Sequence, residues 1–186
     1  DDIDYLKTLN IFDTDFLEYL RGFHFTGDIY AIPEGTIIFP REPLVKVIAP
    51  VMEAQLIETA LLNILNHQSL IATKASRVVY AAQGDGIMEF GLRRAQGPDA
   101  GIYGARAAMI GGCVGTSNVL TGQMFHVPVK GTHAHSWIMS FPDEYTAFKA
   151  YANQYPNACI LLVDTYDVLD SGVPNAIRVF KEMQAE

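Results

Sequence analysis

The chain has little cysteine and no long apolar run, and each shortage excludes a class of protein. Its 186 residues include two cysteines, Cys113 and Cys159, which lie outside any Cys-x-x-Cys pattern. Two reduced thiols in a cytoplasm fit this usage better than a disulfide framework does. No window approaches the roughly 18 consecutive apolar residues that a membrane span needs. We therefore expect a cytoplasmic protein with no membrane partner.

Positive charge is also scarce. Lysine and arginine number 13 against 21 aspartates and glutamates, which gives a net charge of −8. Nucleic-acid surfaces depend on a basic face that replaces counterions, so we expect no nucleic-acid partner. Any anionic ligand must instead meet a local basic cluster. The length suits one ordinary domain with a proper core, or pieces of two.

The amino side of the chain predicts helices, then short strands, then a long helix. Apolar residues recur at helical spacing in the first 23 residues, where Asp2 and Asp13 are candidate N-caps and Gly22 a candidate stop. Residues 27–50 are β-branched, nearly alternating and interrupted by prolines, which predicts three short antiparallel strands. The next segment has no proline or glycine until Gly84 and predicts a long helix, which we expect to be broken once near residues 66–69.

After residue 84 the pattern changes to alternating strands and helices. The short apolar runs IMEF, VPVKGT and ACILLVD lie between helix-like segments at 99–110, 117–125, 143–155 and 174–183. Buried, non-alternating strands that alternate with helices are typical of a parallel sheet or barrel. The predicted class is α/β with an α+β amino-side part, divided into a region at 1–84 and a region at 85–186.

Ligand sites in parallel α/β folds gather at the carboxyl ends of the strands. One such end carries Arg93 and Arg94, whose planar guanidinium groups suit a carboxylate or a phosphate. The alternative is that the two arginines are solvated or pair with Asp99 and Glu89. Nearby glycines favour a ligand, because they allow it to lie close to the backbone.

A glycine-rich turn, IGGCVGTSNV, precedes a predicted helix with Ser117 or Asn118 as its cap. Backbone amides exposed in such a turn can hold a phosphate. Turn-to-helix junctions commonly look like this without binding anything, so the motif alone leaves both interpretations open.

The segment GTHAHSW places His133 and His135 two positions apart after a predicted strand. A metal-ligand pair like that of the barrel amidohydrolases needs further ligands. The other histidines fit this poorly, and we expect no metal bound by the protein. A hydrogen-bonded structural histidine is a second alternative. A third strand end, LLVDTYD, brings Asp164 and Asp167.

Several long motifs resemble one enzyme family, the nicotinate phosphoribosyltransferases. They cover most of the chain in order: GDIYAIPEGTIIFPREPLVKVIAP, ETALLNILNHQSLIATKA, EFGLRRAQGPDAGIYGARAAMIGG, GTSNVLTG, GTHAHSWIMSFPDE and LLVDTYDVLDSGVPNAI. The resemblance implies an enzyme that joins nicotinate to 5-phosphoribosyl 1-pyrophosphate and releases pyrophosphate. It implies coupling to ATP hydrolysis through a phosphohistidine, with Mg²⁺ carried by the substrates, in the NAD salvage route.

The resemblance also assigns site residues. The phosphorylated histidine ends the GTxAH motif and is His135, whereas His133 falls at the variable position and receives no role. Arg93 and Thr132 match the positions that would bind the nicotinate carboxylate. Weaker candidates for phosphate or phosphoribosyl contacts are Arg94, Ser117, Asn118 and Ser136.

For the fold, the resemblance implies a β-rich domain of the α/β-hammerhead kind and the first half of an irregular, TIM-like barrel. The family's stacking tyrosine and its later phosphate-binding loops would lie outside these 186 residues, so we expect the chain alone to be inactive. A homodimer is implied for the full-length protein. The alternatives are a nicotinamide- or quinolinate-using relative, or a non-catalytic fragment or module.

Overall fold

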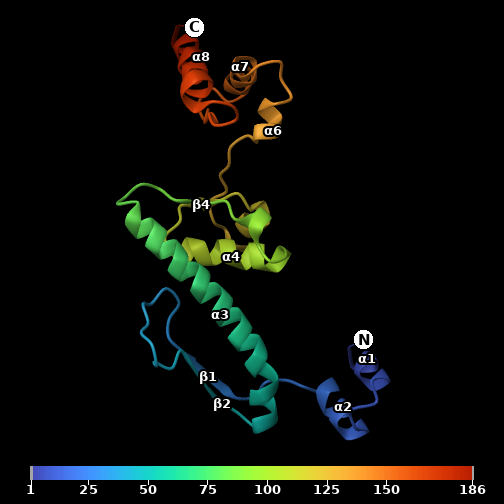
Figure 1. Ribbon diagram of the computed structural model, residues 1–186. Helices are drawn as coiled ribbons and strands as arrows, with labels where there is room; N and C mark the ends of the chain where they lie inside the picture. Colours follow the sequence, from blue (N-terminus) through green and yellow to red (C-terminus); the bar gives the residue numbers. More distant parts are fainter. Residues whose placement is uncertain (1, 186) are drawn as a thin grey trace.

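A computed structural model of the chain describes residues 2–185. The molecule is elongated, with the amino-terminal helices at one end and the carboxyl-terminal helices at the other (Figure 1). The long helix α3, Val51–Ala81, connects the two halves. Among residues 2–185 no helix is long and apolar enough to cross a membrane.

Two short helices open the chain, as the spacing predicts: α1, Asp2–Thr8, and α2, Thr14–Arg21. The Asp13 carboxylate caps α2 by accepting a hydrogen bond from the backbone N–H of Phe16 at 2.8 Å, and Gly22 ends the helix. Asp2 is not the expected N-cap, because it is the first residue within α1.

The next segment forms two strands and not the expected three. Strands β1, Asp28–Ala31, and β2, Val45–Ile48, pair antiparallel with Asp28 opposite Ile48. The residues between them form a loop that is tied by a bidentate ion pair between Glu34 and Arg106, at 2.6 and 2.8 Å. This loop therefore finds its partner in a later helix and not in a third strand.

Helix α3 runs for 31 residues without the expected break at 66–69. The predicted break region packs instead against α4, Pro98–Ile110, where Gln68 accepts a hydrogen bond from Arg106 at 2.9 Å. The two helices approach closely through small residues, and Ala105, Ala107 and Ala108 are buried. Small buried residues let two helix backbones come together, so continuous packing holds α3 straight.

A parallel sheet begins in the second half, as expected, but with very short strands. Strand β3, Met88–Glu89, pairs parallel with β4, Gly115–Thr116, and Thr116 forms a parallel bridge to Val129. The sequence pattern did not predict β4, because its GGCVGTS context is typical of a turn. The VPVKGT run joins this sheet through the single bridge at Val129 and forms no longer strand among the described residues.

The helices expected at 99–110, 117–125, 143–155 and 174–183 are present, and short helical segments that were not predicted lie before or between them. The 3-10 turn η1, Leu92–Arg94, leads into α4, and α5, Val119–Phe125, starts after Asn118, whose side chain accepts from the backbone N–H of Thr121 at 3.2 Å. The later helices are α6, His135–Ile138; α7, Glu144–Gln154; the π-helical turn η2, Val168–Gly172; and α8, Val173–Ala185.

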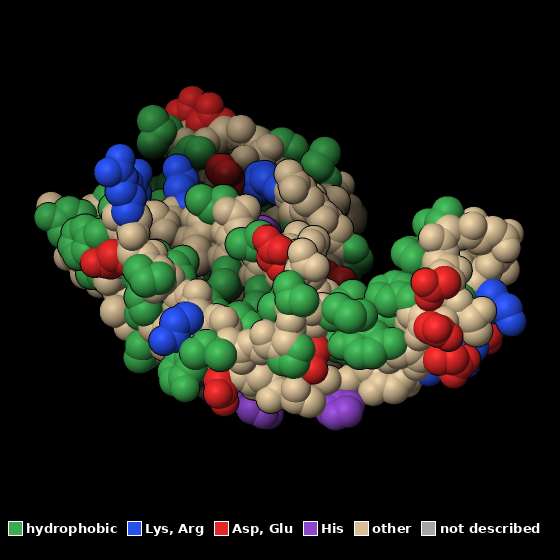
Figure 2. Space-filling model, turned by 90° about the horizontal axis from the view of Figure 1, so that it is seen from below, with side chains coloured by type: hydrophobic (Ala, Val, Ile, Leu, Met, Phe, Trp, Pro, Cys, Tyr) green, Lys and Arg blue, Asp and Glu red, His purple; other side chains and the backbone are tan. Residues whose placement is uncertain are grey.

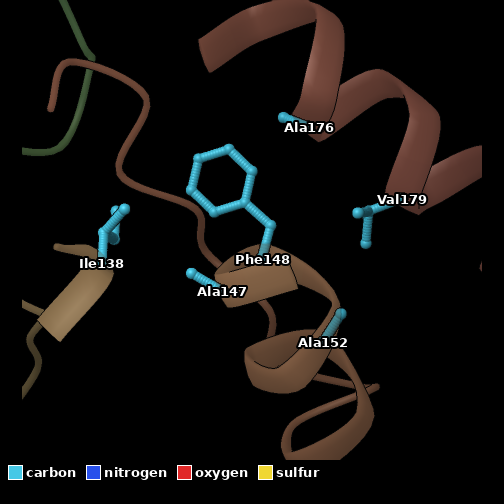
Figure 3. Packing of buried hydrophobic residues seen from close by; sticks show 6 residues of the cluster. All are labelled: Ile138, Ala147, Phe148, Ala152, Ala176 and Val179. Carbon is cyan, nitrogen blue, oxygen red and sulfur yellow. The ribbon is translucent and has the colours of Figure 1, made fainter. Parts of the chain in front are cut away.

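The carboxyl-terminal helices share a compact core. Phe148 of α7 is fully buried and points toward α8, where it meets Ala176 and Val179 (Figure 3). Ile138 of α6 completes the cluster and is also fully buried. This core fixes the position of the short helix α6, which begins at His135.

The expected strand ACILLVD is not a strand in this structure. Residues 158–164 pass beside α7 in an irregular conformation. The backbone N–H of Leu162 donates to the imidazole of His133 and not to a neighbouring strand. A side chain thus takes the hydrogen bond that a ladder would have used.

Candidate functional site

The carboxyl ends of β3 and β4 form the first group of candidate residues. The Glu89 carboxylate accepts hydrogen bonds from the backbone N–H of Gly91 and from the Thr116 hydroxyl, the latter at 2.6 Å. The Ser117 backbone N–H donates to the Glu89 carbonyl at 3.1 Å. Glu89 therefore joins the turn that carries the arginines to the turn before α5.

Arg93 and Arg94 lie in the 3-10 turn η1 with exposed side chains. No ion pair to either arginine is found within residues 2–185, and the carboxylate oxygens of Glu89 are already bonded elsewhere. The expected alternative pairing with Glu89 is thus not formed. Two guanidinium groups remain available to an anion at the strand ends.

Ser117 and Asn118 occupy the turn after β4. Asn118 is buried with 4% of its surface exposed, and its side-chain oxygen caps α5. Its Nδ2 is buried with no hydrogen-bond partner among the described residues. Ser117 is half-buried beside it. The arginines and this turn share one edge, because the carboxyl ends of parallel strands lie together.

His135 and Asp164 form the second group. His135 starts α6, and its Nε2 lies 2.9 Å from Oδ1 of Asp164, which follows the irregular segment 158–164. Both side chains are about half exposed, at 48% and 59%. The pair is thus accessible to a ligand while the carboxylate fixes one nitrogen of the ring.

Thr132 and Ser136 lie next to this pair in the chain. Ser136 is in the first turn of α6 and Thr132 is in the extended segment before it, both with exposed side chains. The segment is continuous with the bridge at Val129, so it leads from the first group to the second. Thr132 therefore connects the strand ends to His135.

His133 differs sharply from His135. It is half-buried, its Nε2 accepts a hydrogen bond from the Leu162 backbone N–H at 3.3 Å, and its ring contacts Trp137, Phe148 and Tyr151. Burial, with a smaller effect of neighbouring His135, lowers the pKa of His133 below its usual value. Burial and the acceptor role of Nε2 therefore both favour the neutral imidazole.

The two histidines do not converge on one point, because His133 bonds a backbone N–H and His135 bonds a carboxylate. Within residues 2–185 no three His, Cys, Asp or Glu side chains are grouped in a way that could hold a metal ion. A hollow of about 530 Å³ lies beside the middle of α3, between this helix, the 31–45 segment and the end of α4, with Ile37, Leu65 and Ile110 in its lining.

Similarity to known proteins shows the family of this chain. The family model described as the nicotinate phosphoribosyltransferase N-terminal domain matches residues 1–66. A nicotinate phosphoribosyltransferase of Bacillus subtilis is 55% identical over 181 residues, which is 97% of this chain and 37% of the relative. The chain belongs to the nicotinate phosphoribosyltransferase family. The motifs around Arg93 and His135 lie within the aligned length.

Solved structures agree with this assignment. Human nicotinic acid phosphoribosyltransferase matches with a TM-score of 0.86 and 34% identity, over 98% of this chain and 46% of that one. A nicotinate-nucleotide pyrophosphorylase from Pyrococcus furiosus matches with a TM-score of 0.68 and 35% identity, over 77% and 37%. The chain spans less than half the length of each of these similar proteins.

Sequence reasoning missed three contributors to the two groups. Asp164 was noted as a strand-end acid but not paired with His135, and Glu89 was expected only as a partner of the arginines. His133 received no role. For Asp164, the available signal was the apolar run that ends at this residue. Nothing in the sequence indicated the side-chain bonds of Glu89 and His133.

Proposed function

We propose that this chain is the amino-side part of an enzyme that makes nicotinate mononucleotide and pyrophosphate from nicotinate and 5-phosphoribosyl 1-pyrophosphate, coupled to ATP hydrolysis. In this proposal His135 receives the γ-phosphoryl group of ATP. The observation that carries the proposal is the exposed His135–Asp164 pair, with Nε2 and Oδ1 2.9 Å apart.

The pair suits His135 to phosphoryl transfer. When Nε2–H donates to Asp164, the lone pair of the imidazole lies on Nδ1. Nδ1 then attacks the γ-phosphorus, the bond from that phosphorus to the bridging oxygen of ADP breaks, and ADP leaves. The ring gains positive charge as the N–P bond forms, and the Asp164 carboxylate stabilises that charge. Later hydrolysis of the phosphoramidate returns neutral His135 and phosphate.

The first group suits the anionic partners of the reaction. We assign Arg93, with Thr132, to the nicotinate carboxylate, because an exposed guanidinium with no ion pair within residues 2–185 offers a charge-assisted hydrogen bond. Arg94, Ser117, Asn118 and Ser136 are the weaker candidates for phosphate or phosphoribosyl contacts. Mg²⁺ would arrive bound to the phosphates of the substrates and would neutralise charge on the leaving pyrophosphate.

In this proposal the chain is divided into two structural regions. Residues 1–84 contribute helices and a β-rich domain of the α/β-hammerhead kind, and residues 85–186 begin an irregular phosphoribosyltransferase barrel. The support is the antiparallel pair β1–β2 in the first region and the parallel pair β3–β4 in the second. The full-length enzyme would be a homodimer in the cytoplasm.

Product formation tests the proposal. The full-length protein that contains this chain should convert labelled nicotinate to nicotinate mononucleotide when supplied with phosphoribosyl pyrophosphate, Mg²⁺ and ATP. Nicotinamide and quinolinate, offered in parallel, should react far more slowly, because neither presents the single carboxylate that Arg93 and Thr132 would bind. Faster turnover of either competitor would reject the assignment of nicotinate as the substrate.

A further inference from the structure

His133 and His135 make two bonds in the same register. His133 reaches Leu162, and His135, two residues later, reaches Asp164, two residues after Leu162. The two segments therefore run in parallel and are joined by side chains at alternate positions. The inner bond, His133–Leu162, is partly buried, and the outer bond, His135–Asp164, is exposed.

The inner bond fixes the tautomer of His133. A nitrogen that accepts from the Leu162 N–H carries no proton, so neutral His133 is protonated on Nδ1. That Nδ1 is buried and has no hydrogen-bond partner within residues 2–185. Leaving a buried donor unpaired is costly, so packing alone does not explain a histidine at this position. An apolar aromatic residue would fill the same space without that cost.

The surroundings hold the His133 ring in one orientation. The ring centroid lies 4.7 Å from that of Tyr151 and 5.3 Å from that of Trp137. Phe148, which is fully buried, closes a further side at 6.2 Å. The acceptor nitrogen thus has a fixed direction, and the Leu162 backbone is held at a defined place against α7.

We propose that His133 is a positioning residue for the phosphoryl acceptor: its Nε2 anchors the Leu162 backbone and thereby holds the Asp164 carboxylate against His135. The proposal rests on the proposed function for its catalytic consequence, but the anchoring itself can be tested separately. Without the anchor, segment 158–164 keeps its apolar packing but has no strand ladder to orient its backbone, so the Asp164 carboxylate can turn away from His135.

Two variants separate acceptor chemistry from packing. His133→Phe keeps an aromatic ring but cannot accept a hydrogen bond, whereas His133→Gln keeps an acceptor oxygen near the position of Nε2. His67→Phe is the matched control, because His67 is also half-buried and bonds a backbone group, the Ala100 carbonyl, at the same 3.3 Å. Each variant is made in the full-length protein, alone and with Asp164→Asn.

The first readout is structural. Crystal structures should place His135 Nε2 within hydrogen-bond distance of Asp164 in the wild type and in His133→Gln, and beyond about 3.5 Å in His133→Phe. If the distance between His135 Nε2 and Asp164 is unchanged in His133→Phe, the proposal is wrong, whatever the activity of that variant. If this readout succeeds but the wild type takes no phosphate from ATP, the anchoring stands and the proposed function fails.

The second readout is the rate at which His135 is phosphorylated by labelled ATP. His133→Phe should slow labelling at least tenfold, His133→Gln should restore most of the rate, and His67→Phe should label like the wild type. In the Asp164→Asn background, His133→Phe should cause little further loss, because both changes break the same arrangement. Independent, multiplicative losses would show that His133 does not act through Asp164.

Discussion

Single residues at the strand ends divide into those that hold the backbone and those that are open to a ligand. Glu89 and Asn118 use their oxygens to fix turns, while Arg93 and His135 present exposed groups. The sequence showed which residue types gather there, but it could not tell the two roles apart. That distinction depends on which backbone N–H groups lie within reach after folding.

Replacing Arg93 by alanine tests the assignment of the nicotinate carboxylate. A charge-assisted hydrogen bond contributes roughly 1.5 to 3 kcal/mol, so the KM for nicotinate should rise about tenfold or more in the full-length enzyme. The KM for phosphoribosyl pyrophosphate should change less. Steady-state kinetics with each substrate varied in turn measure both values.

Arg77→Ala is the matched control, because Arg77 is an exposed arginine on α3, outside both groups. It should leave both KM values unchanged. A wild-type nicotinate KM in Arg93→Ala would mean that Arg93 is only a solvated side chain, and Arg94 would then be the next residue to replace.

The helices and strands show where prediction from the sequence succeeded and where it failed. Helices α2 and α7 were both predicted, and the predicted cap of α2 is confirmed, because Asp13 acts within its own turn. Asp143 caps α7 in the same way but was not predicted as a cap. Strands were predicted less well, since a strand exists only where a partner lies beside it. The ACILLVD run has strand composition but bonds to His133 at Leu162 instead.

Besides their shared apolar core, α7 and α8 are joined by one carboxylate. Glu182 accepts hydrogen bonds from Tyr145 at 2.7 Å, Lys149 at 2.9 Å and Arg178 at 3.2 Å. The bond from Lys149, and then that from Tyr145, lowers the pKa of Glu182 from 4.5 to about 2. A depressed carboxyl pKa adds stability above the unfolded value, and this stability is lost as the pH falls through about 2.

Glu182→Gln should therefore lower Tm by a few degrees at neutral pH, with the difference shrinking below pH 4.5 and vanishing near pH 2. Thermal unfolding followed by circular dichroism across this range measures it. A Tm difference that stays constant with pH would show that the carboxylate charge does not stabilise the contact.

Gly172 sets the distance between η2 and the segment that ends at Asp164. A Cβ at this position would overlap the Val163 carbonyl group, which is backbone and cannot rotate away. Gly172→Ala should displace Val163 and with it Asp164, so we expect lower stability and a weaker His135–Asp164 pair. Thermal unfolding and a crystal structure of the variant measure the two effects.

Gly22→Ala provides the comparison, because a Cβ there meets only the Tyr19 carbonyl oxygen at 3.9 Å. This variant should unfold at nearly the wild-type temperature. Equal stability of the two variants would mean that segment 158–164 yields easily and is not fixed by its contact with η2.

The whole molecule leaves much apolar surface exposed. Ile37, Tyr80 and Leu169 have 83%, 86% and 78% of their surface accessible. Figure 2 shows hydrophobic side chains spread over the face seen from below, including its hollowed centre. Where exposed apolar side chains gather into a large patch, they are typical of a surface that packs against further protein.

The 186-residue chain alone should form no nicotinate mononucleotide. It spans 37% of the length of its Bacillus subtilis relative, and its two groups of site residues are largely exposed. Purified chain is incubated with nicotinate, phosphoribosyl pyrophosphate, Mg²⁺ and ATP, and product is measured by chromatography. Product above the protein-free background would show that these residues already form a sufficient active site.

The most direct test of the account is the phosphorylation of His135. Full-length protein incubated with ATP labelled on the γ-phosphate should carry a label that is stable in base and lost in acid, as a phosphoramidate is and a phosphoserine at Ser136 is not. His135→Asn should abolish that label. His126→Asn should keep it, because His126 is exposed with φ 55°, a conformation that asparagine tolerates well. An acid-labile label that survives in His135→Asn would contradict the account.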